Sequence, residues 1–116
     1  MISIITITYN AAQWLERTMQ SVLAQSCKDY EYIIVDGGSK DGTIDIVKRL
    51  EPLFEGRLSW KSEPDKGLYD AMNKGIARAT GDFLWFMNAG DEIYAPDTLA
   101  HVVAAATEDT DIVYGK

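Results

Sequence analysis

Apolar residues along this chain gather in short, unbroken blocks. Residues 2–8 are mostly β-branched and apolar, and residues 30–36 form a second block of the same kind. Unbroken blocks of this length are typical of strands that are buried on both faces of a sheet. Shorter blocks at residues 57–62, 82–87 and 111–115 predict a third, a fourth and a fifth strand.

Between these blocks the apolar residues recur at helical spacing. Residues 11–25 carry a stripe that consists of Trp14, Leu15, Met19, Val22 and Leu23. Asn10, followed three residues later by Gln13, predicts a capping box at the start of this helix. Further helices are predicted over residues 42–54, 68–79 and 96–107. Gly81 stands where a carboxyl-terminal cap is expected, and Pro96 suits a first helical position.

The regular alternation of strand and helix predicts an α/β fold with a Rossmann-like parallel sheet and helices on both faces. Right-handed crossovers place all the strand carboxyl ends along one edge, where such sheets bind ligands. The sequence ends directly after the predicted fifth strand. We therefore expect residues 1–116 to be the amino-terminal part of a longer domain.

The composition narrows the range of functions. The 116 residues carry a formal net charge of -7, which argues against a nucleic-acid partner because phosphates attract clusters of Lys and Arg. Cys27 is the only cysteine, so an internal disulfide and a thiolate zinc site are both excluded, and a reducing, cytoplasmic setting is favoured. No signal peptide is recognisable, and no apolar run approaches the ~20 residues of a membrane span.

Polar or glycine-bearing segments follow each of the first four predicted strands, so the strand ends hold the candidate site. Thr8 and Tyr9 could contact a nucleobase, or they could simply end a strand next to a helix cap. Asp36 could accept from a base or ribose while Gly37 and Gly38 turn the backbone; the alternative is an ordinary turn with Ser39 or Asp41 as N-cap. The segment "DGGS" is neither a dinucleotide fingerprint nor a P-loop.

Other polar residues have a functional and a structural interpretation. Lys66 at a helix entrance could face a diphosphate, or it could be a solvated lysine. Lys74 and Arg78 fit the exposed face of their helix, and Asp70 suits a first helical turn whatever its function. His101 is expected to be structural, and we expect Trp14, Trp60 and Trp85 in the core.

Four segments in this order, "TYN", "VDGGSKDGT", "EPDKGLYDAMNKGIARATGD" and "FMNAGD", make the sequence resemble the family 2 glycosyltransferases of the GT-A fold. The resemblance spans residues 1–115, and the block "DKGLYDAMNKG" is similar to bacterial members that build surface or extracellular polysaccharide. It implies transfer of a sugar from a nucleotide-diphosphate donor, with inversion, to an acceptor hydroxyl.

The resemblance also implies a site. Thr8, Tyr9 and Asp36 would help to form the nucleotide pocket, and Asp91 would be the remaining metal ligand of the Asp-x-Asp region. With the strand-end residues, the expected nucleotide-sugar site comprises Thr8, Tyr9, Asn10, Asp36, Gly37, Lys66, Asn88, Gly90 and Asp91. A divalent cation, Mn²⁺ or Mg²⁺, would neutralise the charge that grows on the departing diphosphate. Few protein ligands are needed when the substrate supplies others.

The sequence departs from the family at three positions: Gly37 replaces a second aspartate, Gly90 replaces an acid, and Asn88 replaces a frequent aspartate. These replacements bear on the base and ribose contacts and so on the donor, for which a UDP-sugar is the first expectation. The general base of the family would lie beyond Lys116, and no motif assigns that role to Asp65 or Asp70. Residues 1–116 would then be the donor-binding part without the acceptor-binding part.

The resemblance implies further partners and a location. A glycan or lipid-linked acceptor is expected, with the protein in the cytoplasm or peripheral at the inner face of the membrane. An open edge of a shortened sheet would favour a homodimer or low stability. Two rival functions stay open: a nucleotidyltransferase, which would have a glycine-rich basic segment where "TYNAAQWLER" stands, and a non-catalytic nucleotide-binding module or inactive fragment.

Overall fold

The predicted parallel sheet is present in the structure, a computed structural model that describes residues 1–64, 66–81, 83–90 and 112–114. Its five strands are β1 (Ile2–Thr8), β2 (Tyr30–Asp36), β3 (Leu58–Ser62), β4 (Phe83–Asn88) and β5 (Ile112–Tyr114). They lie in the order β3-β2-β1-β4-β5, and every neighbouring pair is parallel. The chain first builds outward from β1 to β3 and then crosses to the other side of β1. The strand order therefore reverses between β1 and β4, which is where such sheets bind ligands.

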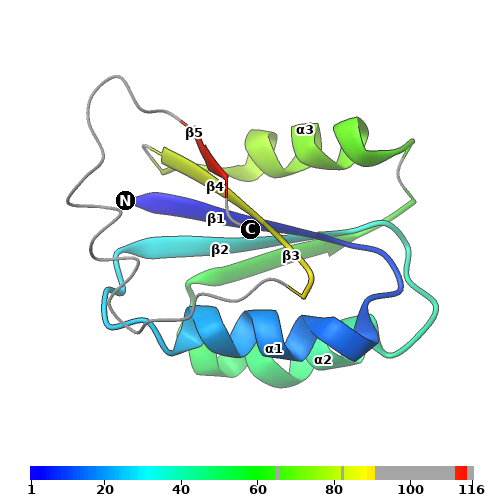
Figure 1. The fold of residues 1–116 in the computed structure, drawn as a ribbon, viewed down its shortest axis with the longest axis horizontal. Helices are drawn as coiled ribbons and strands as arrows, with labels where there is room; N and C mark the ends of the chain where they lie inside the picture. Colours follow the sequence, from blue (N-terminus) through cyan, green and yellow to red (C-terminus); the bar gives the residue numbers. More distant parts are fainter. Residues whose placement is uncertain (65, 82, 91–111, 115–116) are drawn as a thin grey trace.

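Helices cover both faces of the sheet, as predicted. Helices α1 (Ala12–Leu23) and α2 (Thr43–Leu50) lie together on one face, and α3 (Leu68–Arg78) lies on the other (Figure 1). The α1–α2 face buries the larger apolar cluster, which includes Ile4, Leu15 and Phe54. The α3 face buries a smaller cluster built on Ile5, Ile33 and Val35. Strand β1 contributes to both clusters because successive side chains point to opposite faces.

The second predicted helix is shorter than expected. Helix α2 ends at Leu50, and a separate 3₁₀ helix, η1 (Glu51–Phe54), follows it. Pro52 explains the break, because its ring clashes with the carbonyl of residue i−4 and it has no N–H to donate. The change of helix type still places Phe54 fully inside the core.

Two predicted caps are wrong. Helix α1 has Ala11 as its N-cap and no side-chain cap, so the expected capping box from Asn10 is absent. Helix α3 ends on Ala79 in an extended conformation rather than on a left-handed glycine. Gly81 instead passes close to β1, where an added Cβ would lie 2.7 Å from the Ser3 hydroxyl oxygen.

The tryptophan prediction holds only in part. Trp85 is buried and Trp60 is half-buried, but Trp14 is 48% exposed on the first turn of α1. The predicted helix at residues 96–107, with Pro96 and His101, lies outside the described residues. None of the helices in the described part of the chain has the length and apolarity to cross a membrane.

Candidate functional site

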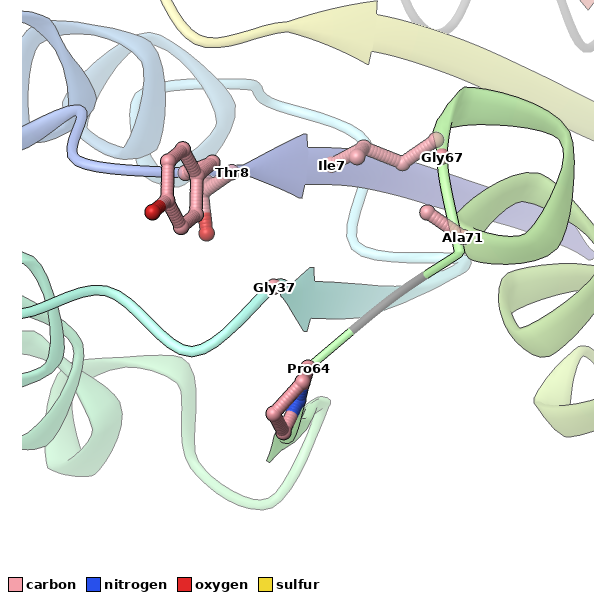
Figure 2. Close-up of a pocket in the computed structure, with 7 residues that line it drawn as sticks. Ile7, Thr8, Gly37, Pro64, Gly67 and Ala71 are labelled. Carbon is pink, nitrogen blue, oxygen red and sulfur yellow. The ribbon is translucent and has the colours of Figure 1, made fainter.

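A pocket of about 560 Å³ opens at the carboxyl ends of β1 and β2. Its walls come from the end of β1, the turn after β2, the loop between β3 and α3, and the first turns of α3 (Figure 2). The lining residues are Ile7, Thr8, Tyr9, Gly37, Pro64, Gly67 and Ala71. Of the predicted site residues, the structure therefore brings Thr8, Tyr9 and Gly37 together at one cavity.

Asp36 is hydrogen-bonded to Thr8, one of the residues that line this pocket. Its side chain is 0% exposed, and Asp36 is not among the lining residues. The hydroxyl of Thr8 donates to Oδ1 at 2.6 Å, and the hydroxyl of Ser62 donates to Oδ2 at 2.8 Å. The backbone N–H groups of Gly38 and Ser39 also donate to Oδ2, and the Ser39 hydroxyl donates to Oδ1. Five donors thus surround the carboxylate in this structure.

This arrangement sets the protonation state of Asp36. Burial raises the pKa of the carboxyl, but the hydrogen bonds from Ser39, Thr8 and Ser62 outweigh burial and hold it below its usual value. Asp36 is therefore ionised at neutral pH. Its contact with a base or ribose stays a prediction, and the structure adds a second role as the anchor of three strand ends.

The partners of Asp36 follow from the strand register. Thr8 lies opposite Asp36, and Asp36 lies opposite Ser62, so the last residues of three neighbouring strands stand in one row. The sequence pattern predicts neither a role for Ser62 nor the contact from Ser39 to Asp36. Ser62 could have been predicted as a partner of Asp36, because each is the last residue of a predicted strand and the two strands are consecutive in the sequence.

Asn10 links the loop after β1 to the loop after β2 by hydrogen bonds and does not cap a helix. It has a left-handed backbone (φ 49°), which asparagine tolerates better than most residues. Its N–H donates to the Ser39 hydroxyl at 2.7 Å, and its Oδ1 accepts from the N–H of Lys40 at 2.9 Å. The neighbouring Tyr9 is left 65% exposed at the pocket.

Backbone N–H groups at the amino termini of α1 and α2 donate hydrogen bonds to side chains of Asp41 and Thr43, which follow β2. Asp41 Oδ2 accepts from the N–H of Ala12 at 3.2 Å, and the Thr43 hydroxyl accepts from the N–H of Ala11 at 2.9 Å. Asp41 Oδ1 also accepts from the N–H of Thr43 at 3.0 Å. One carboxylate thus serves both helix starts and keeps the loops after β1 and β2 together.

The loop between β3 and α3 forms the remaining wall. Its backbone is tied to β2 by the N–H of Glu63, which donates to the Asp36 carbonyl at 2.9 Å. The N–H of Lys66 donates to Asp70 Oδ2 at 2.9 Å, so Asp70 closes the first turn of α3. This hydrogen bond is the main reason why the pKa of Asp70 lies below its usual value. The Lys66 side chain is exposed, and its contact with a diphosphate stays a prediction.

The loop after β4 lies beside α1. Asn88 is exposed at the end of β4, and Gly90 adopts a positive φ of 103°. The N–H of Gly90 donates to the buried hydroxyl of Thr18 at 2.7 Å. A Cβ at Gly90 would contact the Trp14 side chain at 3.6 Å. Thr18 and Trp14 of α1 therefore hold the segment that leads to residue 91.

The predicted metal ligand, Asp91, lies outside the described residues. Within residues 1–64, 66–81, 83–90 and 112–114, no group of three or more His, Cys, Asp or Glu side chains is placed to hold a metal ion. A protein cage of carboxylates is therefore not built by the described part of the chain. The predicted set of metal ligands, the Asp91 carboxylate completed by phosphate oxygens and water, therefore stays a prediction.

Comparison with known proteins identifies the family. Residues 3–116 match the family described as Glycosyl transferase family 2. The chain belongs to this glycosyltransferase family. A PGL/p-HBAD biosynthesis glycosyltransferase of Mycobacterium bovis is 44% identical over 117 residues, which cover 99% of this chain and 46% of that protein. An uncharacterized glycosyltransferase of Mycobacterium tuberculosis is 46% identical over 105 residues, which cover 90% of this chain and 39% of the relative.

Solved structures of similar glycosyltransferases share the fold. S. aureus TarS 1–349 in complex with UDP-GlcNAc superposes with a TM-score of 0.78 at 27% identity, over 89% of this chain and 30% of that TarS chain. The mannosyltransferase PcManGT from Pyrobaculum calidifontis, in complex with GDP-Man and Mn²⁺, gives a TM-score of 0.81 at 30% identity, over 88% of this chain and 31% of PcManGT. The expected GT-A fold is confirmed. The chain spans less than half the length of these family members.

Proposed function

We propose that this chain forms the nucleotide-sugar-binding part of an inverting glycosyltransferase that acts in bacterial polysaccharide or cell-envelope glycan synthesis. The observation that carries the proposal is the pocket at the ends of β1 and β2, where Thr8, Tyr9 and Gly37 meet the first turns of α3. Its position next to the reversal of strand order suits a nucleotide. TarS with UDP-GlcNAc and PcManGT with GDP-Man support a nucleotide-diphosphate donor.

Each wall of the pocket offers a different kind of contact. The exposed ring of Tyr9 can stack on a nucleobase. The backbone at Gly37 has no side chain in the way, so a ribose can approach closely. The amino terminus of α3, preceded by Lys66, presents positive charge and backbone N–H groups to a diphosphate. Hydrogen bonds to Asp36 hold Thr8 and the loop after β2 in place at this pocket.

A divalent cation belongs to this proposal. The chain carries a formal net charge of -7, so a bare diphosphate meets an unfavourable overall field. A bound Mn²⁺ or Mg²⁺ would supply charge neutralisation on the leaving diphosphate. We assign Asp91 as its protein ligand, with Asn88 and Gly90 as the residues that lead up to it. The complex of PcManGT with Mn²⁺ supports the choice of a divalent ion.

The rest of the reaction needs a general base and an acceptor site. We propose that the general base and the acceptor site lie in sequence beyond Lys116, and that a glycan or lipid-linked acceptor meets the protein at the inner face of the membrane. Asp70 is not a candidate base in this account, because its carboxylate accepts from Lys66 N–H and pairs with Lys74. The 116-residue chain is therefore expected to bind donor weakly and to transfer no sugar.

Calorimetric titration of the chain with UDP-, GDP- and dTDP-sugars, with and without Mn²⁺, tests the proposal. We expect the UDP-sugar to bind most tightly and Mn²⁺ to strengthen binding. Tyr9→Ala should weaken binding by about 1–3 kcal/mol, the usual contribution of base stacking, whereas Tyr9→Phe should preserve it.

Each outcome has a clear meaning. Binding that is lost in both Tyr9→Ala and Asp91→Ala supports a donor site built as described. Equal binding by wild type and Tyr9→Ala contradicts the assignment of the pocket. Absence of binding with every donor, with or without metal, favours an inactive module. Efficient sugar transfer by these 116 residues would contradict the proposed division between donor and acceptor parts.

A further inference from the structure

Lys74 of α3 contacts three groups that hold the pocket wall. Its Nζ lies 3.2 Å from Glu63 Oε1 and 3.3 Å from the carbonyl oxygen of Pro64, both in the loop between β3 and α3. It also lies 3.4 Å from Oδ2 of Asp70, one helical turn earlier. The sequence predicts Lys74 on the exposed face of α3, and the structure adds that its side chain is only 24% exposed and contacts these groups.

The same loop also lines the pocket. Pro64 and Gly67 line the cavity, and Pro64 lies against the turn after β2, where a Cβ on Gly38 would come within 3.5 Å of it. Lys74 therefore contacts a segment that also shapes the site. The carbonyl that Lys74 binds belongs to Pro64, a lining residue.

The contacts of Lys74 differ from an ordinary surface ion pair. A single exposed pair contributes little to stability, because holding two long side chains in place costs entropy. Here one ammonium is shared by two carboxylates and a carbonyl, and Asp70 is already fixed by the N–H of Lys66. The hydrogen bond from Lys74 is also the main reason why the pKa of Glu63 lies below its usual value.

We propose that Lys74 is a positioning residue for the donor, which fastens the Glu63–Pro64 segment to α3 and so fixes the pocket wall that Pro64 and Gly67 form. This inference rests on the proposed function, because it takes the pocket to be the nucleotide-sugar site. Lys74 acts through the loop and does not itself contact the donor. Lys74 then acts through its ion pair with Glu63. The negative charge of Glu63 would by itself oppose the binding of an anionic ligand.

The sign of the Glu63 effect separates this role from a direct one. If Lys74 bound a phosphate directly, removing the Glu63 charge would strengthen UDP binding or leave it unchanged. If Lys74 positions the wall through Glu63, the neutral variant Glu63→Gln weakens binding even though it removes a repulsive charge. The two variants should then share one effect, so their double mutant should lose little more than either single one.

The experiment measures the Kd for UDP with Mn²⁺ by calorimetry in wild type, Lys74→Met, Glu63→Gln and the double variant. Lys61→Met is the matched control. Lys61 lies in β3, and its Nζ is 3.6 Å from Oε2 of Glu63, so its substitution removes the same charge beside Glu63 without changing α3. Thermal unfolding of each variant establishes that it is folded. We expect Kd to rise at least threefold in each single variant and by less than the product of the two in the double variant.

The control should change Kd by less than twofold. Tighter or unchanged binding by Glu63→Gln overturns the proposal, as does an equal loss in Lys61→Met or an unchanged Kd in Lys74→Met. A wild-type chain that binds no UDP contradicts the proposed function itself. That result is distinct from the case in which wild type binds and the Lys74 variants bind equally well.

Discussion

At the scale of single residues, Asp36 determines how the strand ends of the site are held. It is an ionised carboxylate without solvent exposure, and donors from the ends of β1 and β3 and from the loop after β2 converge on it. Such a group stabilises the fold only while its donors remain, because a buried charge without partners is costly. The same contacts keep Thr8 and Gly37 at the pocket, so stability and binding depend on one side chain.

Replacing Asp36 by Asn should destabilise the protein by about 2–3 kcal/mol at pH 7, because the amide loses charge and brings N–H groups toward donors. Chemical denaturation followed by circular dichroism measures this difference. Asp45→Asn, in the exposed first turn of α2, is the matched control. It should lower the free energy of unfolding by no more than about 0.5 kcal/mol.

The pH dependence of that difference follows from the lowered pKa of Asp36. A carboxyl whose pKa is lower in the folded than in the unfolded state contributes stability above its unfolded value of about 3.9. That contribution is lost as pH falls through the folded pKa. The stability gap between wild type and Asp36→Asn should therefore be full at pH 6–7 and shrink below about pH 4. A gap that grows on acidification would contradict the assignment.

At this scale the sequence predicts which strand-end residues meet at one pocket, but not all of their contacts. Thr8, Tyr9 and Gly37 were predicted to meet, and they line one pocket. Asn10 was predicted as a helix cap because its spacing to Gln13 fits, but its side chain binds the backbone of Lys40, 30 residues away. Partners that distant are chosen by the register of the strands, which local sequence patterns do not contain.

At the scale of elements, the position of α3 depends on how closely it approaches β1. Gly75 faces the sheet, and a Cβ there would lie 2.7 Å from Cγ2 of Ile5, whose side chain is fully buried. The sequence alone suggested an ordinary helix at residues 68–79 and gave no reason for this glycine. A break in the helix at Pro52 could have been predicted, because proline ends regular helices.

Gly75→Ala should therefore destabilise the protein although alanine favours helix. Overpacking costs about 1–3 kcal/mol, and the gain in helix propensity is about 1 kcal/mol, so we expect a net loss of about 1 kcal/mol. Asn73→Ala on the exposed side of the same helix is the control and should be neutral or slightly stabilising. A stabilising effect of Gly75→Ala in denaturant titration would show that α3 can move away from β1.

At the scale of the whole molecule, the strand order brings distant parts of the sequence to one edge. The ends of β1 and β2, the loop after β3 and the start of α3 all meet there, while β4 delivers its loop beside α1. The alternation of strands and helices predicted this fold, and the order of four motifs predicted the family. The sequence could not reveal which side chains hold the loops in place, and the contact of Lys74 on α3 with the loop after β3 is the clearest case.

The proposed function requires that the pocket at the ends of β1 and β2 binds the nucleotide of the donor. This binding can be followed on the backbone amide signals of the ¹⁵N-labelled chain during a titration with UDP and Mn²⁺. We expect the largest shifts on Thr8, Tyr9, Gly37 and Gly67, with little change at Glu31 and Gly81 on the opposite edge of the sheet. Shifts centred on that opposite edge, or none at saturating UDP, would contradict it.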